Sequence, residues 1–216
     1  MIFALIVGGI LLVFTKDFSH TVEKGGDRNA CHTSVLLKAK NPLKAGELNC
    51  KTDSVLLDTF DQQKIMKTVA EEAYWCWWQF GEGQLDFIDM QAIQGKGNIM
   101  CFLCADIQFS DKAKAKYPQG INGFSTYLKE TSLQPKYDGS YADYLPLPSD
   151  TPLDTISTQS GFRIAFFGSK IREFSPNTPF LFALGPFDRL FVRGMLYSTG
   201  DIKEVCDEVV IGEPLS

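Results

Sequence analysis

The segment TFDQQKIMKTVAEEAYWCWWQFGEG, which runs from Thr59 to Gly83, decides the fold, because its apolar residues recur with the period of a helix. Thr59 followed three residues later by Gln62 matches a capping box, so we expect the helix to begin near Phe60. Gly81 and Gly83 predict its end, since glycine adopts a left-handed cap without strain. The sequence therefore predicts one helix of about twenty residues.

One face of this helix is predicted to face the core. A turn of roughly 100° per residue gathers one apolar stripe. The stripe consists of Ile65, Met66, Val69, Ala70, Ala73, Cys76, Trp77 and Phe80. Tyr74, Trp75 and Trp78 fall on the opposite, largely polar side. Because rings of this size are costly to leave in water, we expect a loop of the same chain or another molecule to cover them, which makes them candidate interaction residues.

The composition predicts a single globular domain. The chain has 216 residues, of which 44% are hydrophobic, enough to build a substantial core. Its 17 Phe and 10 Pro favour a packed, loop-rich α+β chain over a helical bundle or a disordered one. The net charge of −5 and the lack of a basic cluster with interleaved aromatics argue against a nucleic-acid partner.

The clearest strand is Ile99–Phe109, in which every odd position is apolar and the even positions include Asp106 and Gln108. Further strands are predicted at Ser34–Leu37, Ser54–Leu57, Phe162–Phe167, Phe180–Leu184 and Leu190–Tyr197, with a last strand or short helix at Lys203–Ile211. Short strands separated by turns favour an antiparallel sheet. The expected fold is therefore an α+β domain, with an antiparallel sheet packed against the long helix.

A shorter amphipathic helix is predicted at Ile121–Thr131, after a solvated turn of helix at Asp111–Tyr117. The segment Leu133–Gln159 contains four prolines and no sustained periodicity. Loops of this length are usually flaps, covers or linkers, so we expect it to cover the three rings of the long helix. The residues expected to do so are Tyr137, Tyr141, Tyr144 and Leu145.

The chain opens with an unbroken apolar run, MIFALIVGGILLVF, from Met1 to Phe14. As a helix it spans about 21 Å, which is less than the ~30 Å hydrocarbon core of a bilayer. A buried core helix is one interpretation; we prefer a membrane anchor over residues 1–17, and whether it starts upstream of Met1 stays open. Residues 18–216 then form one domain outside the cytoplasm.

Six cysteines allow three interpretations. They are Cys31, Cys50, Cys76, Cys101, Cys104 and Cys206. Cys101 and Cys104 form a C-x-x-C pair, but residues three apart on a strand point to opposite faces, which argues against thiol exchange. A zinc site would need a second closely spaced ligand pair, and the sequence offers only the adjacent Cys31 and His32. Structural disulfides, which suit an extracytoplasmic domain, are the preferred interpretation, and free thiols in a cytosolic protein are the alternative that remains.

The predicted faces suggest how these cysteines pair. Cys76 faces the core from the helix and Cys101 from the strand, so their bond is the first expectation, with Cys104 as the substitute partner if the strand is bulged. Cys31 with Cys50 would close a loop near the amino end. The pair left over is Cys104 with Cys206.

No catalytic residue, cofactor or metal is predicted from the remaining motifs. His20 and His32 are the only histidines, and neither lies near a nucleophile signature. The sequence contains no phosphate-binding glycine loop and no dinucleotide fingerprint. Glu82, Asp86 and Asp89 form an acidic cluster that could act as a carboxylate pair or a loose cation site. The cluster lacks the alternating ligand spacing of a calcium loop, so a solvated turn is the preferred interpretation.

The sequence resembles two groups of known proteins. The block EEAYWCWWQFGEGQLDF followed by CFLCADIQF resembles uncharacterised archaeal proteins with one N-terminal membrane segment, over roughly Leu48 to Leu145. The apolar run leading into a globular head resembles the layout of type IV pilin-like proteins. The first resemblance implies only an archaeal, membrane-tethered α+β domain. From the sequence as a whole we expect a structural or interaction module of the cell envelope, with a second copy or an envelope protein as partner. The alternative is an envelope enzyme, a hydrolase or thiol oxidoreductase, with its cleft under residues 133–159.

Overall fold

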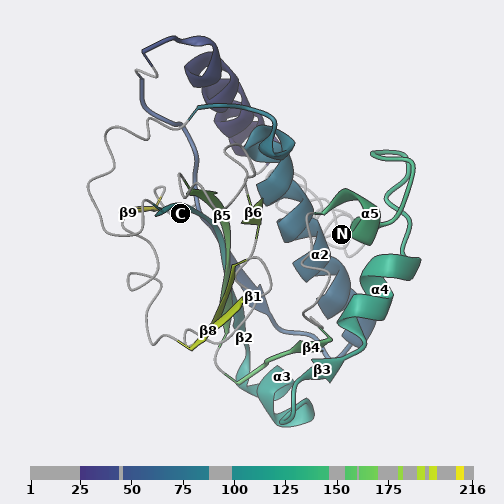
Figure 1. The fold of residues 1–216 in the computed structure, drawn as a ribbon. Coiled ribbons are helices and arrows are strands. Elements are labelled where there is room, and N and C mark those ends of the chain that lie inside the picture. The colour runs from purple at the N-terminus through teal and green to yellow at the C-terminus, as the bar shows by residue number, and fades with distance from the viewer. Residues whose placement is uncertain are drawn as a thin grey trace, which may run out of the picture.

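The computed structural model has a mixed α+β fold in which helices cover one face of a small sheet (Figure 1). It describes residues 25–43, 46–87, 99–145, 154–159 and 161–169, and the strand residues 180–181, 189–192, 195–198 and 208–211. In the part of the chain so described, no helix combines the length and apolar character needed to cross a bilayer. The predicted anchor over residues 1–17 lies outside the described residues.

The sheet is built around β2 (Ile99–Phe109), which has the bounds predicted from its alternation. β5 (Phe162–Ser169) pairs with it antiparallel on one side, and β6 (Phe180–Leu181) continues beyond β5. On the other side, β1 (Asp53–Leu57) and β9 (Glu208–Ile211) each run parallel to one half of β2. The predicted antiparallel sheet is therefore wrong in part. The long helix between β1 and β2 carries the chain back across the sheet, a crossover typical of parallel pairs.

The predicted long helix is α2 (Gln62–Gln79). Its N-cap is Asp61, whose carboxylate accepts hydrogen bonds from the amides of Gln63 and Lys64 at 2.9 and 3.2 Å. The capping box expected from Thr59 is wrong, because the Thr59 hydroxyl instead accepts from the Asp61 amide at 3.2 Å. The end is as predicted: a short 3-10 turn, Gly81–Gly83, follows α2, and both of its glycines have positive φ.

The core lies between α2 and strands β2 and β5. All eight residues of the predicted stripe are buried. At the carboxyl end of the helix, the Phe80 ring lies 4.7 Å from that of Phe166 and 5.0 Å from that of Phe102, between ring centroids. Phe87, which follows the 3-10 turn, stacks on Phe80 at 5.6 Å. The sheet-facing side of α2 is therefore a continuous apolar contact.

The face that β2 turns toward α2 changes along the strand. Its register with β5 shifts between Leu103 and Ala105, which marks a bulge at Cys104. Before the bulge, the even residues Phe102 and Cys104 face α2; after it, odd residues such as Ile107 do. The predicted odd core face is therefore correct only for the second half of the strand.

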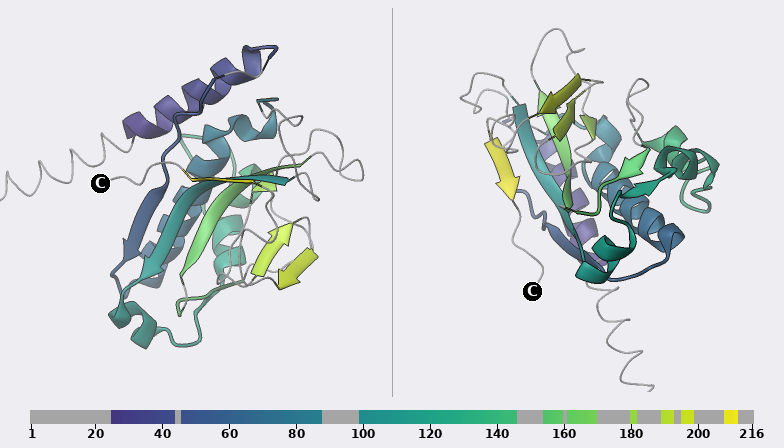
Figure 2. Two further views of the ribbon diagram at one scale, coloured as in Figure 1. Left: turned by 90° about the vertical axis from the view of Figure 1, so that its left-hand side faces the viewer. Right: turned by 90° about the horizontal axis from the view of Figure 1, so that it is seen from below.

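Smaller elements complete the described structure (Figure 2). They are a helix over residues 25–40, α3 (Asp111–Lys116), β3 (Ile121–Asn122), α4 (Phe124–Glu130), α5 (Tyr141–Tyr144), β4 (Thr155–Ile156), β7 (Arg189–Val192) and β8 (Met195–Ser198).

Three sequence predictions need correction here. The strand predicted at Ser34–Leu37 belongs to the helix of residues 25–40, because its apolar residues continue the helical stripe of Arg28, Cys31 and Val35. The helix predicted at Ile121–Thr131 is divided at Gly123, whose φ of +86° ends β3 before α4 begins. The strand predicted at Leu190–Tyr197 is a hairpin of β7 and β8.

Candidate functional site

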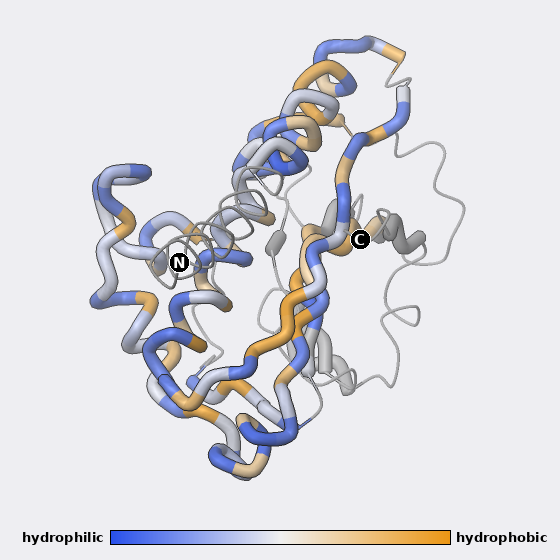
Figure 3. The backbone as a smooth tube through the Cα atoms, turned by 180° about the vertical axis from the view of Figure 1, so that it is seen from behind, coloured by the Kyte–Doolittle hydropathy of each residue, from blue (hydrophilic) through white to orange (hydrophobic). Residues whose placement is uncertain are grey.

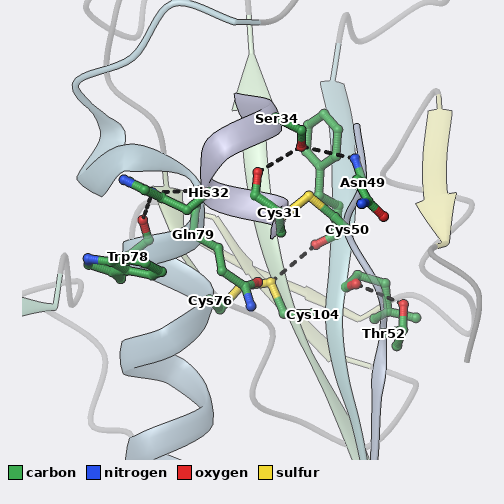
Figure 4. The surroundings of a disulfide bond; sticks show 12 residues. Cys31, His32, Ser34, Asn49, Cys50, Thr52, Cys76, Trp78, Gln79 and Cys104 are labelled. Atoms are coloured by element: carbon green, nitrogen blue, oxygen red, sulfur yellow. Dashed lines mark hydrogen bonds between the residues drawn. A yellow bond between two sulfur atoms is a disulfide. The ribbon is translucent and has the colours of Figure 1, made fainter. Parts of the chain in front are cut away.

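Two disulfides lie close together where the helix of residues 25–40 and α2 meet the sheet (Figure 4). Cys31 is bonded to Cys50, with 4.3 Å between their Cα atoms, which ties that helix to the segment leading into β1. Cys76 is bonded to Cys104, with 5.5 Å between their Cα atoms, which ties α2 to β2. The bonds thus connect the helices directly to the sheet.

The predicted pairing is right for one bond and corrected for the other. Cys31 pairs with Cys50 as expected. The first expectation for Cys76, a bond to Cys101, is wrong, because the bulge turns Cys104 toward α2 and makes it the partner. The leftover pair of Cys104 with Cys206 is therefore also wrong. Cys101 is itself disulfide-bonded, and Cys206 lies outside the described residues.

The bond pattern also bears on the two alternative cysteine chemistries. Cys104 is bonded to Cys76, so the C-x-x-C pair does not form a disulfide of its own. Among the residues with described positions, no group of three or more His, Cys, Asp or Glu side chains is arranged to hold a metal ion.

The second candidate site is a row of rings on the outer side of α2. Trp75 makes edge-to-face contacts with Tyr74 at 5.1 Å and with Trp78 at 5.5 Å, between ring centroids. The row continues at both ends, where Tyr144 lies 5.0 Å from Tyr74 and His32 stacks on Trp78 at 4.2 Å. We call these five residues the aromatic row. Trp75 and Trp78, its central members, are only partly buried.

The row is covered by two segments rather than by one loop. As predicted, residues of the segment 133–159 cover Tyr74: Tyr144 lies against it, and Tyr137 packs on Tyr144 at 5.1 Å. Tyr141 and Leu145 are buried nearby in the core. Trp78 is instead covered by His32, from the helix of residues 25–40.

Two cations lie against the rings. The Lys136 ammonium lies 4.7 Å from the ring centroids of both Tyr74 and Trp75. The Arg28 guanidinium lies 5.0 Å from the centroid of Trp75. A cation at such distances is attracted by the electron-rich ring face. The centre of the row is therefore held by charge as well as by apolar contact.

Arg28 also joins three elements through a buried ion triad. Its guanidinium donates to Asp53 of β1 and to Glu72 of α2, each at 2.6 Å, and all three side chains are buried. Charge-assisted hydrogen bonds of this length are among the strongest in proteins. Breaking such a pair in the interior is costly, so the triad fixes the first helix against the sheet.

Glu82 contacts the other end of the row. It is the residue between the two terminal glycines and has a φ of +55°, a strained value for a side chain other than glycine. Its carboxylate accepts a hydrogen bond of 2.6 Å from the Tyr144 hydroxyl. Burial, followed by this contact with Glu82, raises the pKa of Tyr144 above its ordinary value. Burial likewise raises the pKa of Tyr74.

Among the described residues, the predicted acid and base groups Glu82 and His32 contact opposite ends of the aromatic row. Asp89, of the same acidic cluster as Glu82, lies outside the described residues. Nδ1 of His32 bonds the carbonyl of Trp78 at 2.9 Å, so that nitrogen carries a proton. His20 also lies outside the described residues.

No family model, curated protein or solved structure matches this chain. The functional proposals therefore rest on its own residues.

The sequence did not predict the roles of Arg28 and Lys136, which hold the centre of the aromatic row. A signal for Arg28 existed, because it lies three residues before Cys31 and seven before Val35, on one face of a helix. The sequence contains no such signal for Lys136, since the position of its side chain depends on the path of a loop.

Proposed function

We propose that this chain is a membrane-anchored domain outside the cytoplasm that acts as a structural or interaction module of the cell envelope. A pilin-like filament subunit is one form of this proposal, and the archaeal resemblance of the EEAYWCWWQFGEGQLDF block is compatible with it. The observation that carries the proposal is the oxidised state of the cysteines. Every described cysteine is disulfide-bonded.

The bonds support this location because disulfides persist in oxidising compartments and are rare in the cytosol. They also have a structural effect suited to an exposed domain. Each closes a loop of the unfolded chain, over 19 residues for Cys31–Cys50 and 28 for Cys76–Cys104. Loops of this size correspond to a stabilisation of about 3 kcal/mol each in the chain-entropy treatment.

The aromatic row supports the interaction role. Tyr74 is buried by its own chain, whereas Trp75 and Trp78 retain exposed area. Tryptophan rings that are partly exposed and held rigid by neighbours are typical anchors of protein interfaces. The partner proposed for this row is an envelope protein.

The test is the state of the thiols inside living cells. Cells that make the protein are treated with N-ethylmaleimide before lysis, and the purified full chain is weighed by mass spectrometry. We expect none of the six cysteines to be modified. Proteolysis without reduction should then release the peptides joined by Cys31–Cys50 and Cys76–Cys104. Since Cys206 is the one cysteine left, we expect the third bond to join it to Cys101.

A sample reduced and unfolded before labelling is the control, and all six cysteines should react in it. If the chain taken from cells carries six labels, its thiols are free where it works, and the extracytoplasmic location is refuted. Labelling of Cys101 and Cys206 alone would leave the location standing and contradict only the third bond.

A second candidate function, an envelope hydrolase, is favoured by one observation. Glu82 is strained at a positive φ and its carboxylate lies beside Tyr144, under the segment 133–159. Strained residues of this kind are concentrated at functional sites. Full-length chain that hydrolyses model glycosides or esters, and loses that activity in Glu82→Gln, would support the enzyme; equal rates in the two proteins would exclude this carboxylate.

A further inference from the structure

Four of the five large hydrophobic side chains that are strongly exposed among the described residues form two pairs. The first pair is Leu37, 66% exposed, and Leu43, 80% exposed, at the end of the helix of residues 25–40. The second is Leu56, 67% exposed, and Phe60, 58% exposed, where β1 leads into α2. Single exposed leucines are normal, whereas exposed apolar residues that gather on one surface are typical of interaction sites.

The two pairs carry opposite charge. Lys38 and Lys40 lie beside the leucines of the first pair, and hydrophobic and hydrophilic residues alternate along this end of the helix (Figure 3). Asp58 and Asp61, both exposed, flank Phe60 in the second. We call these surfaces the basic patch (Leu37, Lys38, Lys40 and Leu43) and the acidic patch (Leu56, Asp58, Phe60 and Asp61).

The patches lie at opposite ends of the molecule. In Figure 1 the helix of residues 25–40 ends at the top, whereas β1 runs downward and leads into α2 near the bottom. The turned view in Figure 2 gives the same separation. The two patches of one chain therefore cannot bind each other.

Both patches are held in place by the fold. The Cys31–Cys50 bond and a hydrogen bond of 2.9 Å from the Asn49 amide to the Ser34 hydroxyl brace the base of the basic patch. At the acidic patch, Asp58 accepts a hydrogen bond of 2.7 Å from the Ser110 hydroxyl, and the Phe60 carbonyl accepts one of 2.5 Å from the Tyr117 hydroxyl. Surfaces fixed in this way lose little conformational freedom on binding.

We propose that the basic patch of one copy binds the acidic patch of the next, so that the chain associates head to tail. Two leucines with two lysines then face a leucine and a phenylalanine with two aspartates. Such a contact is heterologous, and one that joins opposite ends of a subunit generates rows or filaments rather than closed dimers. The proposal rests on the filament form of the proposed function and names the surfaces that it would use.

The size of the patches sets the expected strength. A stable interface buries about 1,200 Å² or more in total, and two pairs of apolar side chains cover only part of that. We therefore expect weak association in solution and stronger association when copies share one membrane, since tethering raises the effective concentration. This predicts a subunit that assembles on a surface and separates when extracted.

The first experiment reads out which surfaces meet. Full chain at natural isotope abundance and full chain labelled with ¹⁵N are reconstituted together in vesicles of neutral lipid. A carbodiimide then joins amines and carboxylates that lie in direct contact. We expect mixed-isotope peptides that link Lys38 or Lys40 to Asp58 or Asp61. Mixed peptides that link only other regions, or no mixed peptides at all, would overturn the proposal.

The second experiment separates head-to-tail binding from two self-binding patches. The variant Leu37→Ser/Leu43→Ser lacks the basic patch, and Leu56→Ser/Phe60→Ser lacks the acidic patch. All four positions are exposed, so both variants should fold. We expect cross-linked oligomers to fall at least tenfold in each variant alone, and a 1:1 mixture to give dimers and nothing larger. Lys129→Ser/Glu130→Ser, at two exposed positions of α4 outside both patches, is the control and should assemble like the native chain.

Two outcomes overturn the proposal here. Dimers formed by either variant alone would mean that each patch binds the same patch of a second copy. The second outcome combines two observations: native copies do not cross-link, and the basic-patch variant no longer binds anionic vesicles. Together they would mean that the basic patch binds lipid instead of a second copy. Neither result depends on the thiol labelling in cells, so failure of this inference and failure of the proposed location are distinguishable.

Discussion

The two sides of α2 are stabilised in different ways. On the side that faces the sheet, Phe80 packs among Phe87, Phe102 and Phe166, and the Cys76–Cys104 bond crosses the contact. On the outer side, Lys136 and Arg28 lie against the aromatic row, and the Tyr144 hydroxyl of the row donates to Glu82. The first side depends on shape and apolar area, and the second on contacts that respond to charge and pH.

This difference indicates which substitutions the chain can tolerate without loss of stability. Apolar packing in an interior is close to crystal density, so a missing group leaves a cavity that the neighbours do not fill. The exposed cation of Lys136 over its partly exposed ring is less demanding, because water replaces it at small cost, whereas Arg28 is also held by its buried ion triad. We therefore expect mutations on the sheet-facing side to alter stability, and those on the outer side to alter interaction and pH response.

The largest effect is expected for Phe80→Ala. Removing this fully buried ring should lower the free energy of unfolding by about 4 kcal/mol, through lost transfer energy and a residual cavity. Urea unfolding followed by circular dichroism, with the disulfides intact, measures it. Phe60→Ala, at a ring that is 58% exposed, is the matched control and should change stability by less than about 0.5 kcal/mol. Equal losses in the two variants would mean that burial against the sheet does not account for the contribution of Phe80.

The same contrast explains which parts of the fold could be predicted from the sequence. The sheet-facing side follows from periodicity, so its eight residues and the bounds of β2 were predicted correctly. The bulge at Cys104 could not be located, because it inserts no distinctive residue and appears only in the register with β5. The partner of Cys76 shifted for that reason, and the prediction had allowed for it.

For the outer side, the sequence predicted that the rings need a cover but not every residue that provides it. The surplus of rings at Tyr74, Trp75 and Trp78 indicated that something must cover them, and the segment 133–159 does cover Tyr74. His32 and Arg28 were not placed there, because their helix was predicted as a strand at Ser34–Leu37. Long-range contacts made by short polar segments leave little trace in local periodicity.

A smaller effect, which depends on pH, is expected for a substitution on the outer side of α2. Tyr144→Phe removes the hydrogen bond to Glu82 and should cost about 1 kcal/mol at pH 7. Because the folded chain raises the pKa of Tyr144, the stability that this tyrosine contributes is present below the unfolded value of about 10 and declines as pH rises above it. The gap between native and variant proteins should therefore narrow above pH 10. Urea unfolding from pH 7 to 11 measures it, and parallel curves would contradict the assignment.

The smallest effect is expected for Lys136→Gln, which removes the cation from Tyr74 and Trp75 but keeps a polar side chain of similar length. An exposed cation over a ring contributes about 0.5 kcal/mol, so the loss in unfolding free energy should be of that size. Lys129→Gln, at an exposed lysine of α4, is the matched control and should have no measurable effect. Tryptophan emission should shift in Lys136→Gln alone, because the charge lies beside Trp75. If both variants leave emission and stability unchanged, the charge does not hold the outer side, and ring packing alone accounts for it.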